Sequence, residues 1–160
     1  MTSLGTHIWN VVTKASARLF SLNMLRRAKV APRDIIKIYC SKIRPVLEYA
    51  TAVWHPGLTS ELNDLIEHVQ ERALRIASPY SSYEDACKIF NIPTLFERRK
   101  SICQKLFKNM QLPEDKLFNL LPPRKENIHD IRNFWFYSTP TCQTNRFKNS
   151  FVPYVLYNLQ

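Results

Sequence analysis

Apolar side chains recur at steps of three and four residues through the first 110 positions of this 160-residue chain. That period belongs to an α-helix with one buried face, and it differs from the two-residue alternation of a half-buried strand. The sequence therefore predicts a mainly α fold, a small bundle of about four to five helices with an irregular, aromatic-rich C-terminal extension. The expected helices cover residues 7–29, 32–50, 60–77, 82–90 and 94–110.

Prolines and capping residues mark where these helices begin and break. Pro32 suits the first turn of the second helix, where its missing N–H is not needed. Pro45 lies inside the same apolar stripe, and it must kink or split that helix because its ring crowds the carbonyl four residues back. Thr59 or Ser60 is expected to cap the third helix. Capping-box spacing at residues 81–84 and 94–97 predicts the last two helix starts.

The regular pattern ends after residue 111. Pro113, Pro122 and Pro123 interrupt a short apolar run, and the remaining sequence is aromatic, polar and aperiodic. We therefore expect a helical domain over residues 1–111. A Pro-rich linker and C-terminal extension, wrapped on the helices or poorly ordered, is expected over residues 112–160. Within it, residues 133–137 are consistent with a strand or an aromatic anchor.

Composition excludes several classes of protein. Two glycines against ten prolines are too few for a phosphate-cradling loop, a Rossmann turn or a Gly-rich hairpin fold. The longest uncharged stretches reach only about a dozen residues, short of the ~20 of a membrane helix. No basic region leads into an apolar run at the N-terminus, as in a signal peptide. Four cysteines without a C-x-x-C pair indicate free thiols, so we expect an intracellular protein, nuclear or cytoplasmic, that is not secreted.

The residues that usually carry catalysis are dispersed. No two aspartates are adjacent, so the paired carboxylates that hold two cations in nucleotide polymerases are missing. The four cysteines and four histidines are too far apart in sequence for a zinc site of close ligand pairs. Cys103 lies in an apolar stripe and is expected in the core. We therefore predict no catalytic residue, no metal, no cofactor and no small-molecule substrate.

Positive charge is concentrated in the first third of the chain. The net charge is +10, and residues 1–58 contribute nine basic and two acidic side chains, a net +7. Such a concentration is typical of a surface that binds a polyanion, although basic side chains also solvate helix faces. Tyr39, Tyr49 and Trp54 are candidates to stack on bases, although aromatics at helical spacing more often form core. The candidate phosphate contacts are Lys14, Arg18, Arg26, Arg27, Arg33, Lys37, Lys42 and Arg44.

Several segments in collinear order resemble one family. They include I-R-P-V-L-E-Y-A at 43–50, A-V-W-H-P at 52–56, V-Q-E-R-A-L-R-I at 69–76 and T-N-R-F-K-N-S-F at 144–151. Shorter matches lie at 82–86 and 93–99. Together the chain resembles, essentially end to end, the C-terminal part of reverse transcriptases from non-LTR (LINE-type) retrotransposons.

The resemblance implies a thumb-like helical domain and the segment that follows it. The endonuclease, the fingers and the palm with its catalytic aspartates have no counterpart here, so the chain is not expected to be an enzyme. The implied partners are the backbone of RNA or an RNA–DNA hybrid and, in the parent protein, the palm and fingers. Trp9 lies off its apolar stripe and is expected to face the missing palm. The alternatives are a protein–protein interaction module and a non-functional relic of a decayed mobile element.

Overall fold

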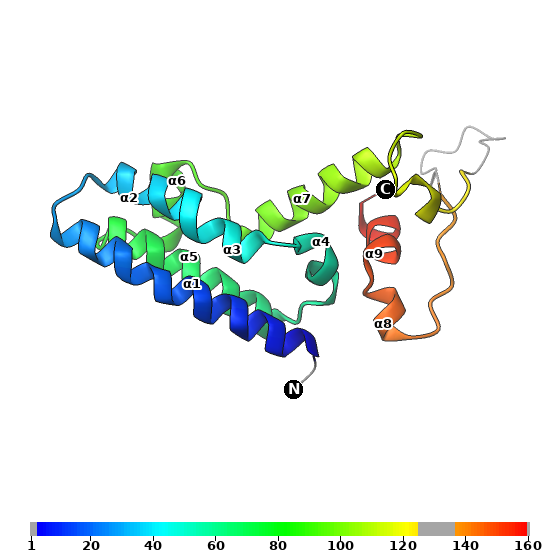
Figure 1. The fold of residues 1–160 in the computed structure, drawn as a ribbon, viewed down its shortest axis with the longest axis horizontal. Coiled ribbons are helices and arrows are strands. Elements are labelled where there is room, and N and C mark those ends of the chain that lie inside the picture. The colour runs from blue at the N-terminus through cyan, green and yellow to red at the C-terminus, as the bar shows by residue number, and fades with distance from the viewer. Residues whose placement is uncertain (1–2, 125–136, 160) are drawn as a thin grey trace. The chain divides into compact units, whose positions relative to one another are not determined.

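The computed structural model describes residues 3–124 and 137–159 (Figure 1). These residues are mainly helical, which confirms the predicted fold class, although they form more helices than the four or five expected. The chain divides into two compact units. Unit 1 comprises Met1–Tyr49 and Leu58–Arg99, and unit 2 comprises Ala50–Gly57 and Lys100–Gln160. The expected domain boundary after residue 111 does not coincide with this division and stays a prediction.

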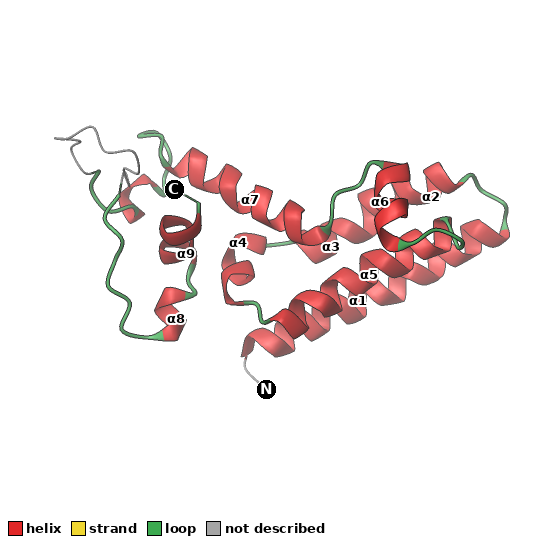
Figure 2. Cartoon of the chain, turned by 180° about the vertical axis from the view of Figure 1, so that it is seen from behind, coloured by secondary structure: helices red, strands yellow, loops and turns green. Residues whose placement is uncertain are grey.

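Unit 1 is built on two long helices that lie side by side, α1 (Ser3–Arg27) and α5 (Ser60–Ala77) (Figures 1 and 2). Between them in sequence run α2 (Pro32–Ile38), the π-helical segment η1 (Tyr39–Ile43) and α3 (Arg44–Glu48). The short helix α6 (Tyr83–Phe90) packs on α5. Helix α7 (Leu95–Met110) begins in unit 1 and continues in unit 2.

Pro45 splits the second predicted helix, as expected. The proline occupies the first turn of α3, and the π-helical residues Tyr39–Ile43 lie immediately before it. Since proline cannot donate to the carbonyl four residues back and its ring crowds that group, the preceding turn must widen. The helix then ends at Glu48, and Ala50 adopts a left-handed conformation with φ 52°. This position separates α3 from α4 (Thr51–Trp54) of unit 2.

The predicted caps are present, one of them shifted by a residue. The Leu62 amide donates to Thr59 Oγ1 at 3.3 Å. Ser82, rather than Ser81, caps α6 by accepting from the Asp85 amide at 3.1 Å. At the start of α7 the box is reciprocal, with Glu97 N–Thr94 Oγ1 at 3.2 Å and Thr94 N–Glu97 Oε2 at 3.1 Å.

The core of unit 1 follows the predicted stripe of α1 but a rotated stripe of α5. Ile8, Ala15, Leu19 and Leu22 of α1 are buried. On α5 the buried positions extend to Gln70, Leu74 and Ala77, whereas Leu62, Leu65 and Ile76, which the helical period places on the apolar stripe, are only half-buried. The buried face therefore carries a polar residue, Gln70, that an apolar stripe does not predict.

Arg99 is the largest departure from the predicted orientation of a side chain. The sequence pattern places it on the outward face of α7, but it is 0% exposed. Its guanidinium donates to the Asn63 side-chain oxygen on α5. Burial of a charged side chain requires such partners, and α5 supplies one from 36 residues away in sequence.

Unit 2 combines two parts of the chain that are far apart in the sequence. It contains α4, the 3₁₀ turns η2 (His55–Gly57) and η3 (Phe118–Leu120), the later part of α7, α8 (Asn145–Lys148) and α9 (Phe151–Asn158). The buried cluster consists of Phe107, Tyr137, Val155 and Leu156. Of the expected strand or anchor at 133–137, only Tyr137 is described, and it is buried in a single antiparallel bridge with Arg124. Positions 133–136 lie outside the described residues.

The structure confirms that Cys103 lies in the core, and it places His68 and His55 beside polar side chains. Cys103 is buried and Cys40 is partly exposed. His68 is exposed and contacts Glu71, with Nδ1–Oε2 at 2.9 Å. His55 packs in unit 2, where its Nε2 lies 3.3 Å from Tyr154 Oη and the rings meet edge to face. Within residues 3–124 and 137–159, no helix has the length and apolar character needed to span a membrane.

Candidate nucleic-acid interface

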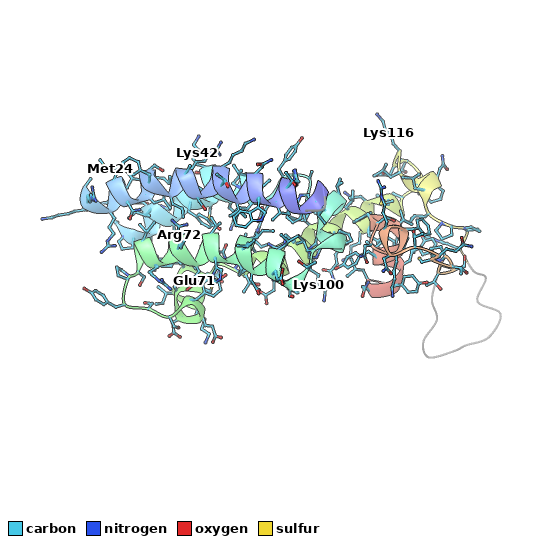
Figure 3. The ribbon with its side chains drawn as sticks, turned by 90° about the horizontal axis from the view of Figure 1, so that it is seen from below. Met24, Lys42, Glu71, Arg72, Lys100 and Lys116 are labelled. Carbon is cyan, nitrogen blue, oxygen red and sulfur yellow. The ribbon has the colours of Figure 1, made fainter. Side chains whose placement is uncertain are left out.

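Three of the predicted cations gather on one side of unit 1. Lys14 and Arg18 lie one turn apart on α1 and are exposed, and α1 carries no acidic side chain. The Arg18 guanidinium crosses to η1 and donates from Nη1 to the Lys42 carbonyl at 2.8 Å. This contact brings the exposed Lys42 beside α1, where Figure 3 labels it. Residues 24 to 28 positions apart in sequence thus form one basic group, which we call the central cluster.

Three more cations lie where α1 turns into α2. Arg26 and Arg27 occupy the last turn of α1, and Arg33 lies in the first turn of α2. Lys29 closes the helix in a left-handed conformation, φ 58°, with Val30 N–Leu25 O at 3.1 Å and Lys29 N–Arg26 O at 3.0 Å. These two bonds form a Schellman motif, which satisfies the last carbonyls of α1 and fixes the turn. We call Arg26, Arg27 and Arg33 the terminal cluster.

The remaining two candidates are engaged by carboxylates. Lys37 Nζ lies 2.9 Å from Asp34 Oδ1, an exposed pair on α2. Arg44 lies 3.7 Å from Glu48, and its side chain is only 18% exposed. The Glu48 carboxylate is shared with Arg98, whose guanidinium donates two hydrogen bonds to it and has its pKa raised by them. Arg44 therefore helps to neutralise a largely buried carboxylate, and we leave it and Lys37 out of the interface.

The predicted stacking residues are mostly buried. Tyr39 is 0% exposed and donates to Gln70 Oε1 at 2.9 Å, and Trp54 is buried in unit 2. Of the three, only Tyr49 remains exposed. The prediction that Tyr39 and Trp54 stack on bases is therefore wrong. The exposed aromatic residues of α1 are Trp9 and Phe20, which lie off the buried stripe. The sequence pattern indicated the exposure of Trp9, because Trp9 lies outside the apolar stripe. It did not single out Phe20.

A polar network inside unit 1 escaped the sequence analysis. Gln70 Nε2 donates to Tyr83 Oη at 2.9 Å and to the Pro93 carbonyl at 3.0 Å. Tyr83 in turn donates to Glu67, which also accepts from the Leu95 and Phe96 amides at 3.0 and 3.2 Å. The Glu67 carboxylate thus caps the N-terminus of α7, where a negative charge is favourable. The network holds α5, α6 and the start of α7 in one arrangement.

Burial raises the pKa of the phenols and thiols near this network. Desolvation raises the pKa of Tyr39 well above its usual range. Desolvation, followed by the hydrogen bond to Glu67, raises the pKa of Tyr83. The pKa values of the Cys40 and Cys87 thiols are also raised, mainly by burial. These shifts favour the neutral forms of all four groups and so disfavour a thiolate or phenolate nucleophile at these positions.

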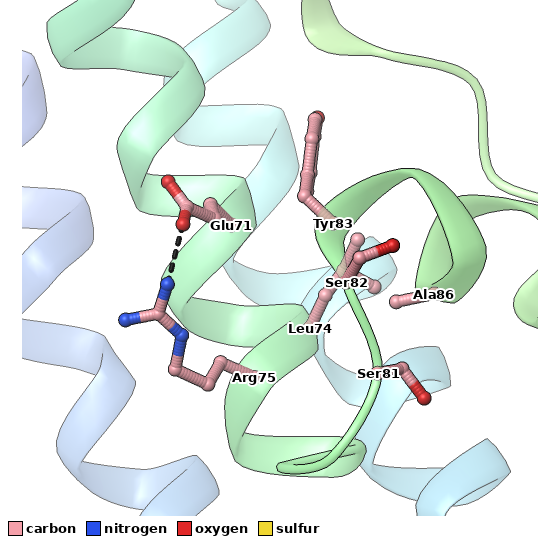
Figure 4. Close-up of a pocket in the computed structure, with 7 residues that line it drawn as sticks. All are labelled: Glu71, Leu74, Arg75, Ser81, Ser82, Tyr83 and Ala86. Atoms are coloured by element: carbon pink, nitrogen blue, oxygen red, sulfur yellow. Dashed lines mark hydrogen bonds and ion pairs between the residues drawn. The ribbon is translucent and has the colours of Figure 1, made fainter.

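A small hollow lies between α5 and the loop that leads into α6 (Figure 4). Glu71 and Arg75 line it and pair with each other, with Oε1–Nη2 at 2.5 Å. Ser82 is occupied as the cap of α6. The polar groups thus satisfy one another instead of converging on a ligand, and among the described residues no three His, Cys, Asp or Glu side chains are grouped to hold a metal ion.

The candidate interface then consists of the central and terminal clusters, six cations on α1, η1 and α2. Comparison with known proteins adds no functional residue to it: no protein-family model, no curated protein and no solved structure matches this chain.

Proposed function

We propose that this chain is a helical module, derived from the thumb region of a non-LTR retrotransposon reverse transcriptase, that binds the backbone of RNA or an RNA–DNA hybrid without reading its sequence. The observation that carries the proposal is the central cluster. There the Arg18 side chain contacts the backbone carbonyl of Lys42 on η1, and Lys14 lies one turn from Arg18 on α1, a helix that has no carboxylate. The family origin rests on the sequence resemblance.

Phosphate binding is the chemistry that such a surface favours. Exposed Lys and Arg side chains neutralise phosphates and release their counterions, and this gain does not depend on the bases. The terminal cluster extends the basic surface, since Arg26 lies about 12 Å beyond Arg18 along α1 at the rise of an α-helix. The proposal contains no catalytic step, because the adjacent aspartates that serve polymerases are missing from the sequence.

The test is fluorescence anisotropy of the full chain against a labelled RNA–DNA hybrid, titrated at several salt concentrations. We expect binding that weakens steeply with salt, with a slope of about −0.9 in log K against log[salt] for each phosphate neutralised on a duplex. Binding that persists unchanged at high salt would instead indicate apolar association and a protein-interaction module. A folded chain that binds nothing at low salt would overturn the proposal.

Charge-reversal variants test whether the central cluster is the surface that binds the hybrid. The double variant Lys14→Glu/Lys42→Glu should weaken hybrid binding and reduce the salt slope by about 2, one phosphate for each lysine. The matched control is Lys105→Glu/Lys108→Glu, which changes the net charge equally at two exposed positions of α7 in unit 2. Equal loss in both variants would show that only net charge matters and would contradict the assigned surface.

A further inference from the structure

We propose that the outer face of α1 binds single-stranded nucleic acid, with unpaired bases stacked on Trp9 and Phe20 and the phosphates following Lys14 and Arg18. This inference rests on the proposed function, because it uses part of the same basic surface. It adds a preference that a phosphate-binding surface alone does not have. The argument begins with the aromatic side chains.

Trp9 and Phe20 form an aromatic edge on α1. Trp9 is 46% exposed and Phe20 is 67% exposed, so a large part of each ring faces solvent. Eleven residues separate them, so at helical geometry they point within about 20° of each other and lie about 16 Å apart along the axis. Met24, 47% exposed, continues the edge toward the end of α1 (Figure 3).

A track of small side chains runs beside this edge. Asn10, Thr13, Ala17 and Ser21 are all exposed, and they follow one another at steps of three and four residues. Side chains at that spacing lie above one another on one face of a helix. Because none of the four is large, a flexible chain can approach the helix backbone between the aromatic and the basic side chains.

Lys14 and Arg18 form the opposite edge of the track. Helical geometry places Lys14 about 140° and Arg18 about 180° around the axis from Trp9, with the track between them. An α-helix with its side chains is about 10–12 Å across, so a strand that crosses the exposed face of α1 obliquely contacts the two edges with different nucleotides. The central cluster supplies positive charge on the edge where the phosphates would run.

This combination favours a single strand over the other occupants of an exposed face. In a duplex the bases are stacked on each other, whereas an unpaired base offers a free face to an aromatic ring. A second copy of α1 would bring four cations against four, with no acidic side chain on either helix. A polyanion with exposed apolar bases matches both edges at once, which is the arrangement found in single-strand binders.

The test compares a 12-nucleotide oligo(dT) with an abasic strand of the same length and with the RNA–DNA hybrid, using the full chain at low salt. We expect oligo(dT) to bind more tightly than the abasic strand and to quench the fluorescence of exposed Trp9. Trp9→Ala/Phe20→Ala should weaken oligo(dT) binding by about fivefold to a hundredfold for each ring, and leave the abasic strand unaffected. Trp9→Phe/Phe20→Tyr should retain most of the affinity.

Tyr80→Ala is the matched control, because Tyr80 is a fully exposed aromatic residue of unit 1 on another element. Thermal unfolding followed by circular dichroism checks that each variant folds. Equal affinity for oligo(dT) and the abasic strand would overturn the stacking while leaving the phosphate surface in place. Failure of all three probes to bind would overturn the proposed function itself. Self-association that survives high salt and is lost in Trp9→Ala/Phe20→Ala would show that protein covers this face.

Discussion

The core of unit 1 consists of the apolar faces of long helices together with a polar network. The core of unit 2 is a small apolar cluster whose residues come from segments far apart in the sequence. In unit 1, Gln70 and Glu67 connect α5 to α6 and to the first turn of α7. In unit 2, Phe107 and Tyr137 meet edge to face with ring centroids 6.2 Å apart, beside Val155 and Leu156. Long amphipathic helices leave room for satisfied polar groups between them, whereas the cluster of unit 2 is mainly apolar, with Tyr137 Oη accepting a hydrogen bond from Arg124 Nε at 3.1 Å.

The largest expected effect comes from opening either core. Leu22→Ala in unit 1 and Leu156→Ala in unit 2 each truncate a side chain that is 0% exposed. Each change should cost about 2–5 kcal/mol of unfolding free energy through lost transfer energy and a residual cavity. Hydrogen exchange should rise in α1 and α5 for the first variant and in α9 for the second. If each substitution raised hydrogen exchange equally in both units, the two units would unfold together as one cooperative unit.

Glu67→Ala should give the next largest effect. It removes the carboxylate that caps α7 and leaves Tyr83 and two amides without their acceptor, at a cost of about 1–3 kcal/mol. Chemical denaturation measures the change. Glu61→Ala, an exposed carboxylate at the start of the same helix, is the control and should change little. An equal cost for both variants would mean that the network does not stabilise unit 1.

Alkaline pH should weaken unit 1 through its buried phenols. The pKa of Tyr39 is raised in the folded state, so the unfolded chain loses this proton first, near pH 10. The stabilising effect is complete below that pH and is lost as the pH rises above it, by at most about 1.4 kcal/mol per pH unit for each such phenol. Tyr39→Phe should flatten the fall in unfolding free energy between pH 10 and 11, whereas Tyr80→Phe should not. The raised pKa values of the Cys40 and Cys87 thiols also make the unfolding free energy fall as the pH rises, beginning at a lower pH. Both Tyr→Phe variants still contain these cysteines, so this contribution is the same in each.

The smallest expected effect is that of a surface ion pair. Arg75 is two-thirds exposed in its contact with Glu71, so Arg75→Ala should change the unfolding free energy by less than about 0.5 kcal/mol. Urea denaturation at low and high salt measures it. A loss above about 1 kcal/mol would show that the Arg75–Glu71 pair stabilises the packing of α5 and α6 more than an exposed ion pair does. In that case the polar interactions that stabilise unit 1 would include this surface pair.

The candidate site was partly readable from the sequence. The eight cations could be named because charge asymmetry needs no structure, and the Lys37–Asp34 pair is a local contact of three residues. The grouping of Arg18 with Lys42, and the withdrawal of Arg44 toward Glu48 and Arg98, could not be predicted. These depend on which turns of η1, α3 and α7 lie opposite one another.

The sequence alone determined the five expected helical segments and several of their ends, but not the short helices α4, α8 and α9. The stripe of α1, the break before Pro45 and the caps at Thr59 and Thr94 follow from rules that act over three or four residues. Tertiary structure decided which side chains meet across those helices. Arg99 is buried because Asn63 of α5 lies opposite it, and Tyr137 is buried against Phe107 thirty residues earlier. Such contacts are fixed by how whole elements pack, and no local pattern in a single sequence specifies that packing.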